Sequence, residues 1–288
     1  MGIALNSALL EENDPMLKSL SQIWLRRELL WILVARNIKI RYKNSVLGFF
    51  WSLLSPLLLI LIYACFAAIL RFNEGRPSYL QFLVIGIIVW QFLSMCLNDS
   101  LYAIMGSSNL VKKTAFPRMI LPLAMVLANL ANFMLTWIVL FLYLLISGMH
   151  FQYLLLLPVV LLAQTALCLG LALCLSACNV FFRDTEHILG VGTLAWFFMT
   201  PIFYPTQMQL KFLPESGAWV AFLNPMTGIM RAYRLLLMSG DLHGVAGELA
   251  VIPVPTSFLW ISAAVCVAVL GIGFAVFQKL QFRFGDEL

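Results

Sequence analysis

The chain has 288 residues, of which 62% are hydrophobic and only 11% are charged. A soluble domain usually carries about 25% charged residues, so this composition excludes a water-soluble globular protein and indicates that lipid is the solvent for much of the chain. The formal net charge of +5 does not indicate nucleic-acid binding, because the basic residues sort by membrane side instead.

The first predicted element is an amphipathic helix over residues 17–36, within a segment 17–44 that ends in a basic flank. Its apolar side chains fall mainly on one side at 100° per residue, although Arg27 interrupts that side. Tryptophans beside basic residues are typical of a helix at the membrane interface. Packing on a cytoplasmic partner is the alternative, and the two are compatible. We interpret the basic residues of 36–43 as the flank of the first span rather than as a site for anionic lipid headgroups.

Six predominantly apolar segments follow, each of a length that suits a membrane-spanning helix. They are residues 46–70, 78–105, 119–147, 152–180, 187–204 and 256–278. Six such segments leave too little polar chain to wrap a soluble core. The predicted fold class is therefore an all-α integral membrane protein, with residues 1–288 forming a single transmembrane domain.

The basic residues also predict an orientation, since they favour the cytoplasmic side of a membrane. If the N-terminus is cytoplasmic, 13 of the 18 lysines and arginines fall inside and five fall outside. Six spans then place the C-terminus inside as well.

The second segment contains Asp99, the only acidic residue well inside an apolar run. An acid within a span is by default a functional hypothesis. Because Asp99 lies near the predicted cytoplasmic end, a structural partner such as a lysine or a backbone amide is favoured over a proton relay.

A short cytoplasmic helix is expected over residues 107–116, between the second and third spans. Ser107 or Ser108 could cap it, and it would carry Lys112 and Lys113. A short charged helix suits docking onto a cytoplasmic protein, although cytoplasmic loops commonly carry lysines.

The longest predicted outer segment, residues 206–255, follows Thr200-Pro-Ile-Phe-Tyr-Pro205, in which two prolines disrupt regular helix. Broken backbone at membrane depth is tolerated only where protein buries it or where it lines a cavity. The apolar content of the segment argues against a disordered loop. We therefore expect re-entrant helices that form a gate over the outer end of a pathway.

The sequence carries no signature of an energy-converting or catalytic site. It lacks the GxxxxGK[ST] of a P-loop and the GxSxG, HExxH and kinase signatures. The six cysteines form no CxxC pair and the three histidines are far apart, so neither a disulfide nor a metal site is predicted. We expect no catalytic residue and no bound cofactor, and a pump would need its ATPase on a separate chain.

Five local sequences run through nearly the whole chain in order. They are Tyr42-Lys-Asn-Ser-Val-Leu-Gly-Phe-Phe-Trp-Ser-Leu-Leu-Ser-Pro56, Asn109-Leu-Val-Lys-Lys-Thr-Ala-Phe-Pro-Arg-Met-Ile-Leu-Pro122, Phe182-Arg-Asp184, Pro201-Ile-Phe-Tyr-Pro205, and Asn224-Pro225 with Arg231-Ala-Tyr-Arg234. Together they resemble the membrane subunit of ABC exporters that move lipid-linked polysaccharide, the permeases of O-antigen, capsule and teichoic acid export.

The resemblance implies a homodimer in the bacterial inner membrane, joined to two cytoplasmic ABC subunits that bind ATP and Mg. It implies that 107–116 inserts into an ATPase cleft through Asn109, Lys112, Lys113 and Thr114. The outer gate it implies consists of Asn224, Pro225, Arg231 and Arg234.

The resemblance also implies a channel between the two protomers, lined by aromatic residues of the first and fifth spans. Aromatic rings would stack on sugar C–H faces and let a polymer slide without strong fixed binding. The candidates are Phe49, Phe50, Tyr63, Phe66, Trp196, Phe197, Phe203 and Tyr204. Aromatic residues in spans often face lipid or pack between helices, which is the alternative for each of them.

The predicted function is thus the permease subunit of an ATP-driven exporter of lipid-linked polysaccharide. The alternatives are an ABC permease for a small lipid or drug, and a membrane assembly scaffold without a pathway.

Overall fold

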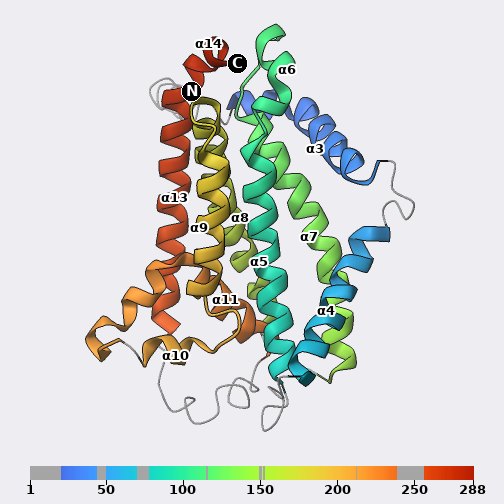
Figure 1. The fold of residues 1–288 in the computed structure, drawn as a ribbon, viewed down its shortest axis with the longest axis vertical. Coiled ribbons are helices and arrows are strands. Elements are labelled where there is room, and N and C mark those ends of the chain that lie inside the picture. Colours follow the sequence, from blue (N-terminus) through green and yellow to red (C-terminus); the bar gives the residue numbers. More distant parts are fainter. Residues whose placement is uncertain are drawn as a thin grey trace, which may run out of the picture.

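A computed structural model of the chain describes residues 21–43, 50–69, 78–114, 116–148, 151, 153–211, 213–238 and 256–288. These ranges contain helices, turns and irregular segments but no strand, and the long helices stand side by side in one bundle (Figure 1). The bundle consists of α4 (Trp51–Ile69), α5 (Tyr79–Leu101), α7 (Ile120–Ile146), α8 (Leu157–Phe181), α9 (Thr185–Met199) and α13 (Leu259–Leu280).

Four helical segments of the described ranges are long and apolar enough to cross a membrane. They are Tyr79–Leu101, Ile120–Ile146, Leu154–Phe181 and Thr256–Arg283, and they coincide with the predicted second, third, fourth and sixth spans. A span needs roughly 20 residues, whereas α9 has 15 and the apolar part of α4 runs from Leu54 to Cys65. The chain is therefore a multi-pass helical membrane protein, and the first and fifth spans stay predictions.

The α5 helix forms the centre of the bundle, because almost every face of it is covered. Leu83, Ile85, Val89, Leu93 and Cys96 are completely buried. The neighbours that cover this helix include α7, α8, α4, α9 and α11 (Pro225–Leu237). A helix that is apolar all round, as this one nearly is, suits the interior of a bundle.

The most extensive helix pair is α8 with α13, which approach each other at two glycines. A Cβ atom added to Gly273 would collide with the carbonyl oxygen of Gly170, and one added to Gly170 would lie 2.5 Å from the carbonyl oxygen of Val269. Small residues allow backbones to approach closely within a membrane, where van der Waals packing holds helices together.

The two ends of the bundle differ in structure and in charge. One end carries α3 (Arg27–Tyr42), α6 (Ser108–Lys113) and α14 (Phe284–Glu287), and the other carries α10 (Thr206–Leu210), the 3₁₀ helix Glu215–Leu223 and α11 (Figure 1). The basic residues of the described ranges gather at the α6 end. The opposite end holds only Lys211, Arg231 and Arg234 among them.

Helix α3 confirms that the N-terminal region is helical, but its buried face differs from the predicted apolar face. Leu30, Leu33 and Val34 are buried, in a cluster that includes the start of α7. At 100° per residue the predicted apolar side includes Trp24, Leu30 and Trp31, but both tryptophans are exposed. The segment has enough apolar residues for two faces, one against the bundle and one outward.

Candidate functional site

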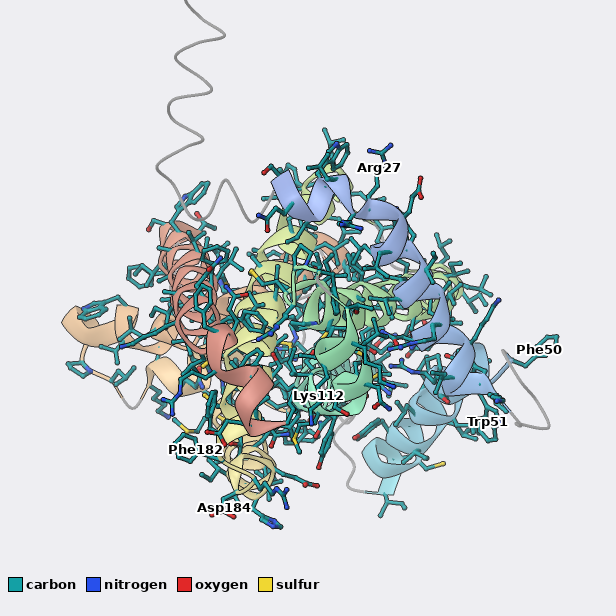
Figure 2. The ribbon with its side chains drawn as sticks, turned by 90° about the horizontal axis from the view of Figure 1, so that it is seen from above. Arg27, Phe50, Trp51, Lys112, Phe182 and Asp184 are labelled. Atoms are coloured by element: carbon teal, nitrogen blue, oxygen red, sulfur yellow. The ribbon has the colours of Figure 1, made fainter. Side chains whose placement is uncertain are left out.

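The predicted coupling segment forms α6, which projects from the end of the bundle and lies near the middle of that end face (Figures 1 and 2). Asn109, Lys112 and Lys113 are exposed, whereas Val111 is buried in a cluster with residues of α3 and α14. One apolar side chain thus anchors the helix while its polar side chains stay accessible.

The flanks of α6 are fixed by hydrogen bonds rather than by a serine cap. The Thr114 hydroxyl donates to the Leu110 carbonyl oxygen at 2.6 Å, although Thr114 remains exposed. Arg36 of α3 reaches Ser107 at 3.5 Å, and Arg118 donates to the carbonyl of Gln281 beside α14. Ser107 is the N-cap residue of α6 but makes no side-chain capping hydrogen bond, and Ser108 is the first residue of the helix.

The turn between α8 and α9 lies at the same end, at the edge of the face where Phe182 and Asp184 are exposed (Figure 2). The carboxylate of Glu186 hydrogen-bonds the Tyr102 hydroxyl, and this contact raises the pKa of Tyr102. The contact links the end of α5 to the start of α9.

The aromatic candidates of the first span lie in different surroundings. Phe50 is 71% exposed at the edge of the molecule, and Tyr63 packs partly buried against the main core. Phe49, like the side chain of Phe66, lies outside the described residues. The outward face of α4 is apolar, with Leu57, Leu58, Leu61 and Ile62 exposed on it.

The aromatic candidates of the fifth span pack inward on α5. Trp196 and Phe197 make edge-to-face contacts with Trp90, at ring-centroid distances of 5.9 and 5.4 Å. Phe203 contacts Phe197 at 5.4 Å, and its carbonyl accepts a hydrogen bond from Tyr79. The exposed face of α9 carries a different set of residues, namely Ile188, Val191, Leu194, Phe198 and Met199.

The α9 helix ends after Met199, and side chains form hydrogen bonds with the backbone beyond that point. The Asn224 carboxamide accepts from Trp196 Nε1 at 2.8 Å and from the Met226 amide at 3.1 Å, which caps α11, and it donates to Thr200 Oγ1 at 3.1 Å. Pro225 occupies the first turn of α11, where its missing N–H is not needed.

Arg234 is the most unusual residue at this end, because its side chain is completely enclosed. It donates hydrogen bonds to the carbonyls of Pro201 at 2.6 Å, Ile202 at 2.8 Å and Phe82 at 3.2 Å. Its guanidinium also lies 3.3 Å from the centroid of the Phe82 ring. Arg234 thus supplies donors to the carbonyls of Pro201 and Ile202, which lie beyond the end of α9, and links them to α5 through Phe82.

Arg231 is the remaining gate candidate, and Tyr204 belongs to the predicted channel lining. Arg231 lies one turn earlier on α11 and is partly exposed. Tyr204 donates to the Phe198 carbonyl at 3.0 Å. Within the predicted gate segment the structure contains the helices α10 and α11, and residues 239–255 lie outside the described residues. A re-entrant gate stays a prediction. Asn224 and Arg234 thus form hydrogen bonds with residues 200–202, which follow the end of α9. Their part in a gate stays a prediction.

Asp99 has a defined partner, as predicted, but the partner is an arginine. Arg41, in the last turn of α3, places Nη2 2.5 Å from Asp99 Oδ2. Asn129 of α7 accepts from the same nitrogen at 2.6 Å and donates to the same carboxylate oxygen at 2.9 Å. The basic segment 36–43 thus contributes an ion pair that joins three helices.

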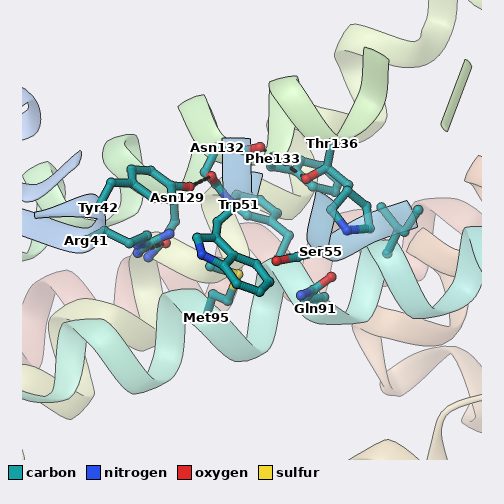
Figure 3. Close-up of a pocket in the computed structure, with 13 residues that line it drawn as sticks. Arg41, Tyr42, Trp51, Ser55, Gln91, Met95, Asn129, Asn132, Phe133 and Thr136 are labelled. Atoms are coloured by element: carbon teal, nitrogen blue, oxygen red, sulfur yellow. Dashed lines mark hydrogen bonds between the residues drawn. The ribbon is translucent and has the colours of Figure 1, made fainter. Parts of the chain in front are cut away.

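A pocket of about 270 Å³ adjoins this ion pair, between the end of α3 and helices α4, α5 and α7 (Figure 3). Its polar lining comes from Arg41, Tyr42, Ser55, Gln91, Asn129, Asn132 and Thr136, and its apolar lining includes Trp51, Met95 and Phe133. Sequence reasoning missed this pocket. The spacing of Asn129, Asn132 and Thr136 within an apolar run was the available signal, because it places three polar groups on one helix face.

No metal site is indicated within the described ranges, where no group of three or more His, Cys, Asp or Glu residues is placed to hold an ion.

Comparison with known proteins gives consistent results. Residues 28–238 match the model of a family described as ABC-2 type transporter. Over 264 residues the chain is 31% identical to an O-antigen export system permease protein of Klebsiella pneumoniae, covering 91% of this chain and 95% of that protein. A protein of the same description from Myxococcus xanthus is 32% identical over 258 residues, which cover 87% of this chain and 95% of the relative.

Proposed function

Since the chain belongs to the ABC-2 type transporter family, we propose that it is the permease subunit of an ATP-driven exporter of lipid-linked polysaccharide, of the O-antigen, capsule or teichoic acid type. The observation that carries this proposal is the similarity, nearly end to end, to O-antigen export permeases of two bacteria. The family is a transporter membrane component, so ATP and Mg would be bound by a separate subunit.

The structure supports α6 as the place where that subunit acts. Asn109, Lys112, Lys113 and Thr114 are exposed around one short helix, which is anchored through the buried Val111. Force applied to α6 would reach α3 and α14, because Val111 shares a cluster with both. We propose two ABC subunits per dimer, one for each α6.

The apolar faces of α4 and α9 support a path formed with a second copy. Both faces carry large exposed side chains, such as Leu61 and Phe198, that the described part of one chain does not cover. A homodimer would bring such faces together around a path that is lined in part by α4 and α9. Of the first-span aromatic candidates whose side chains the structure describes, Phe50 is exposed and Tyr63 is partly exposed.

The distribution of charge supports an orientation in the bacterial inner membrane. The basic α6 end, with α3 and the C-terminal helix, would face the cytoplasm, and α10 and α11 would face outward. The exposed Trp24 and Trp31 of the N-terminal helical region suit contact with membrane lipid at the cytoplasmic interface.

The outer gate would be formed by the break after Met199 together with α11. Asn224 and Arg234 hold this region through five hydrogen bonds to neighbouring groups and one that caps α11. They would position the gate rather than contact the polymer. Arg231, which is partly exposed, is the better candidate for contact.

Two alternatives remain distinct from this proposal. An ABC permease for a small lipid or drug would share the fold and the α6 coupling, whereas an assembly scaffold would need neither. Deletion of the gene in its native bacterium, with complementation by the full chain, separates them. Surface polysaccharide should disappear and polymer should accumulate in the cytoplasm. Unchanged surface glycan with no internal polymer would refute the proposal.

A further inference from the structure

The pocket between α3, α4, α5 and α7 is a polar recess in an otherwise apolar part of the bundle (Figure 3). Asn129, Asn132 and Thr136 lie along one face of α7, and Gln91 and Met95 face them from α5. From residue 129 to residue 136, α7 rises about 10 Å, so the recess extends well below the end of the span. Polar groups at this depth are costly unless something hydrogen-bonds them.

Several polar groups around the pocket have hydrogen-bonding capacity to spare. Gln91 makes no hydrogen bond within the described ranges, and Arg41 Nη1 is a buried nitrogen without a partner in them. Asn132 accepts from the Tyr42 hydroxyl at 2.5 Å through Oδ1, which leaves its NH₂ group for another acceptor. The pocket therefore offers several donors and at least one acceptor to a ligand.

The net charge of the pocket favours a neutral ligand over an anionic one. Arg41 is the only charged residue among the described residues that line it, and Asp99 neutralises that charge at 2.5 Å. An anionic head group would meet no net positive charge and would come close to the Asp99 carboxylate. A neutral ligand rich in hydroxyl groups suits amide side chains such as Gln91 and Asn132 better, because each can both donate and accept.

The volume and the apolar walls of the pocket favour a ligand with one small ring and an apolar chain. Pockets for drug-sized ligands enclose about 300–1,000 Å³, so 270 Å³ suits a single small ring. Trp51 lies across the pocket between the Tyr42 side and the Gln91 side and offers an indole surface (Figure 3). Beyond Trp51, α4 continues with the exposed Leu57, Leu58 and Leu61, along which an alkyl chain could lie.

We propose that this pocket binds the neutral glycosyl head group of a membrane-anchored sugar, with the ring on Trp51 and its hydroxyls on Gln91 and Asn132. The inference rests on the proposed function for the origin of the sugar, which is a lipid-borne glycan. The pocket lies on the α5 and α7 side of α4, so the sugar ring would occupy a site separate from the proposed path, and only the alkyl chain would reach the outward face of α4.

The test uses the full chain in phosphatidylethanolamine nanodiscs and an octyl β-glucoside that carries a diazirine in its alkyl chain near the sugar. Photolabelling of peptides from α4, α5 and α7 should be saturable, and excess octyl β-glucoside should displace it. Gln91→Leu removes an amide of the pocket while keeping the Arg41–Asp99 pair, and it should weaken binding about fivefold or more, the effect of one hydrogen bond. Asn98→Leu, an exposed site on the same helix, should bind like the wild type.

Competitors distinguish the sources of the sugar. Displacement by octyl β-glucoside but not by methyl β-glucoside supports a lipid-borne sugar, and equal displacement by both supports the sugar site but assigns it to a soluble glycan. Equal displacement by octyl phosphate, unsaturable labelling, or unchanged binding by Gln91→Leu would overturn the proposal.

The outcome for this pocket is separable from the outcome for the proposed function. If the wild type restores export in the deletion strain but binds no glucoside, the pocket inference fails and the export function stands. If glucoside binds saturably but the chain is not needed for surface glycan, the pocket stands as a sugar site and the export function fails.

Discussion

Gly86 of α5 makes room for the guanidinium of Arg234 of α11, since a Cβ atom at Gly86 would lie 2.5 Å from Arg234 Nη2. The enclosed arginine donates to the carbonyls of Pro201, Ile202 and Phe82 and so ties the backbone after α9 to the central helix α5. Two residues that are 148 positions apart thus form one structural unit, and it yields the first prediction.

Replacing Arg234 with methionine should destabilise the protein by about 2 kcal/mol or more, because it leaves the buried carbonyls of Pro201 and Ile202 without donors. Arg234→Lys should recover only part of this loss, since one ammonium group cannot reproduce the planar fork of donors. The measurement is thermal unfolding of the purified chain in detergent. Lys211→Met, at an exposed basic site on the same end, is the control. Equal melting temperatures for both variants would contradict the role given to Arg234.

The ion pair of Arg41 and Asp99 should show energetic coupling. Arg41→Gln leaves the Asp99 carboxylate without its cation, and we expect a loss of about 1–3 kcal/mol, because both side chains keep some exposure. Adding Asp99→Asn should restore part of that stability, since no uncompensated charge then remains. A double-mutant cycle of unfolding free energies measures the coupling. Additive losses would show that the two side chains act independently.

The glycine contact between α8 and α13 predicts a sharp difference between two neighbouring positions. Gly273→Ala places a methyl group against Gly170 and should cost about 2 kcal/mol or more by forcing the helices apart. Gly271→Ala meets open space and should be neutral or stabilising by up to about 1 kcal/mol, as alanine favours helix. Unfolding of the two variants under the same conditions tests the contact, and similar values would refute it.

Two aromatic residues of α9 should respond differently, because they lie on different faces. Trp196→Ala loses the contact with Trp90 and the hydrogen bond to Asn224, so stability should fall by about 2–4 kcal/mol. Phe198→Ala removes an exposed ring and should leave the melting temperature nearly unchanged while lowering surface glycan. Normal export by Phe198→Ala would remove that ring from the proposed path.

The lysines of α6 should matter for the ATPase and not for the fold. Reversing both charges, with Lys112→Glu and Lys113→Glu, should lower co-purification with the ABC subunit by about an order of magnitude. The amount of permease in the membrane should not change, since both side chains are exposed. Lys211→Glu, at the opposite end, is the matched control. Undiminished co-purification of the double variant would count against α6 as the docking helix.

The sequence predicted the helical class, four of the spans and the position of α6, because apolar length and a charged interruption are local signals. It did not predict the function of Arg234, since nothing local shows that an arginine of α11 meets carbonyls after Met199. The direction in which Trp196 points also depends on Trp90, more than 100 positions away in the chain.

The contacts of Asp99 could be predicted from the sequence only in part. Its depth in an apolar run predicted a partner, and the structure supplies Arg41 and Asn129. The choice of arginine depends on how α3 crosses the start of α7, which hydrophobic periodicity does not fix. The pocket beside this pair follows from the same crossing, because α3 and α7 line it together.

The contact of Gly170 with Gly273 has a mechanical consequence. Helices that touch backbone to backbone cannot slide or tilt past each other without a steric clash. We therefore expect α8 and α13 to move as one rigid body. By contrast, α4 and α9 have wide uncovered faces and lie against fewer neighbours. During a transport cycle the α8–α13 pair would then stay fixed. The helices that move would be α4 and α9, which lie beside the proposed path.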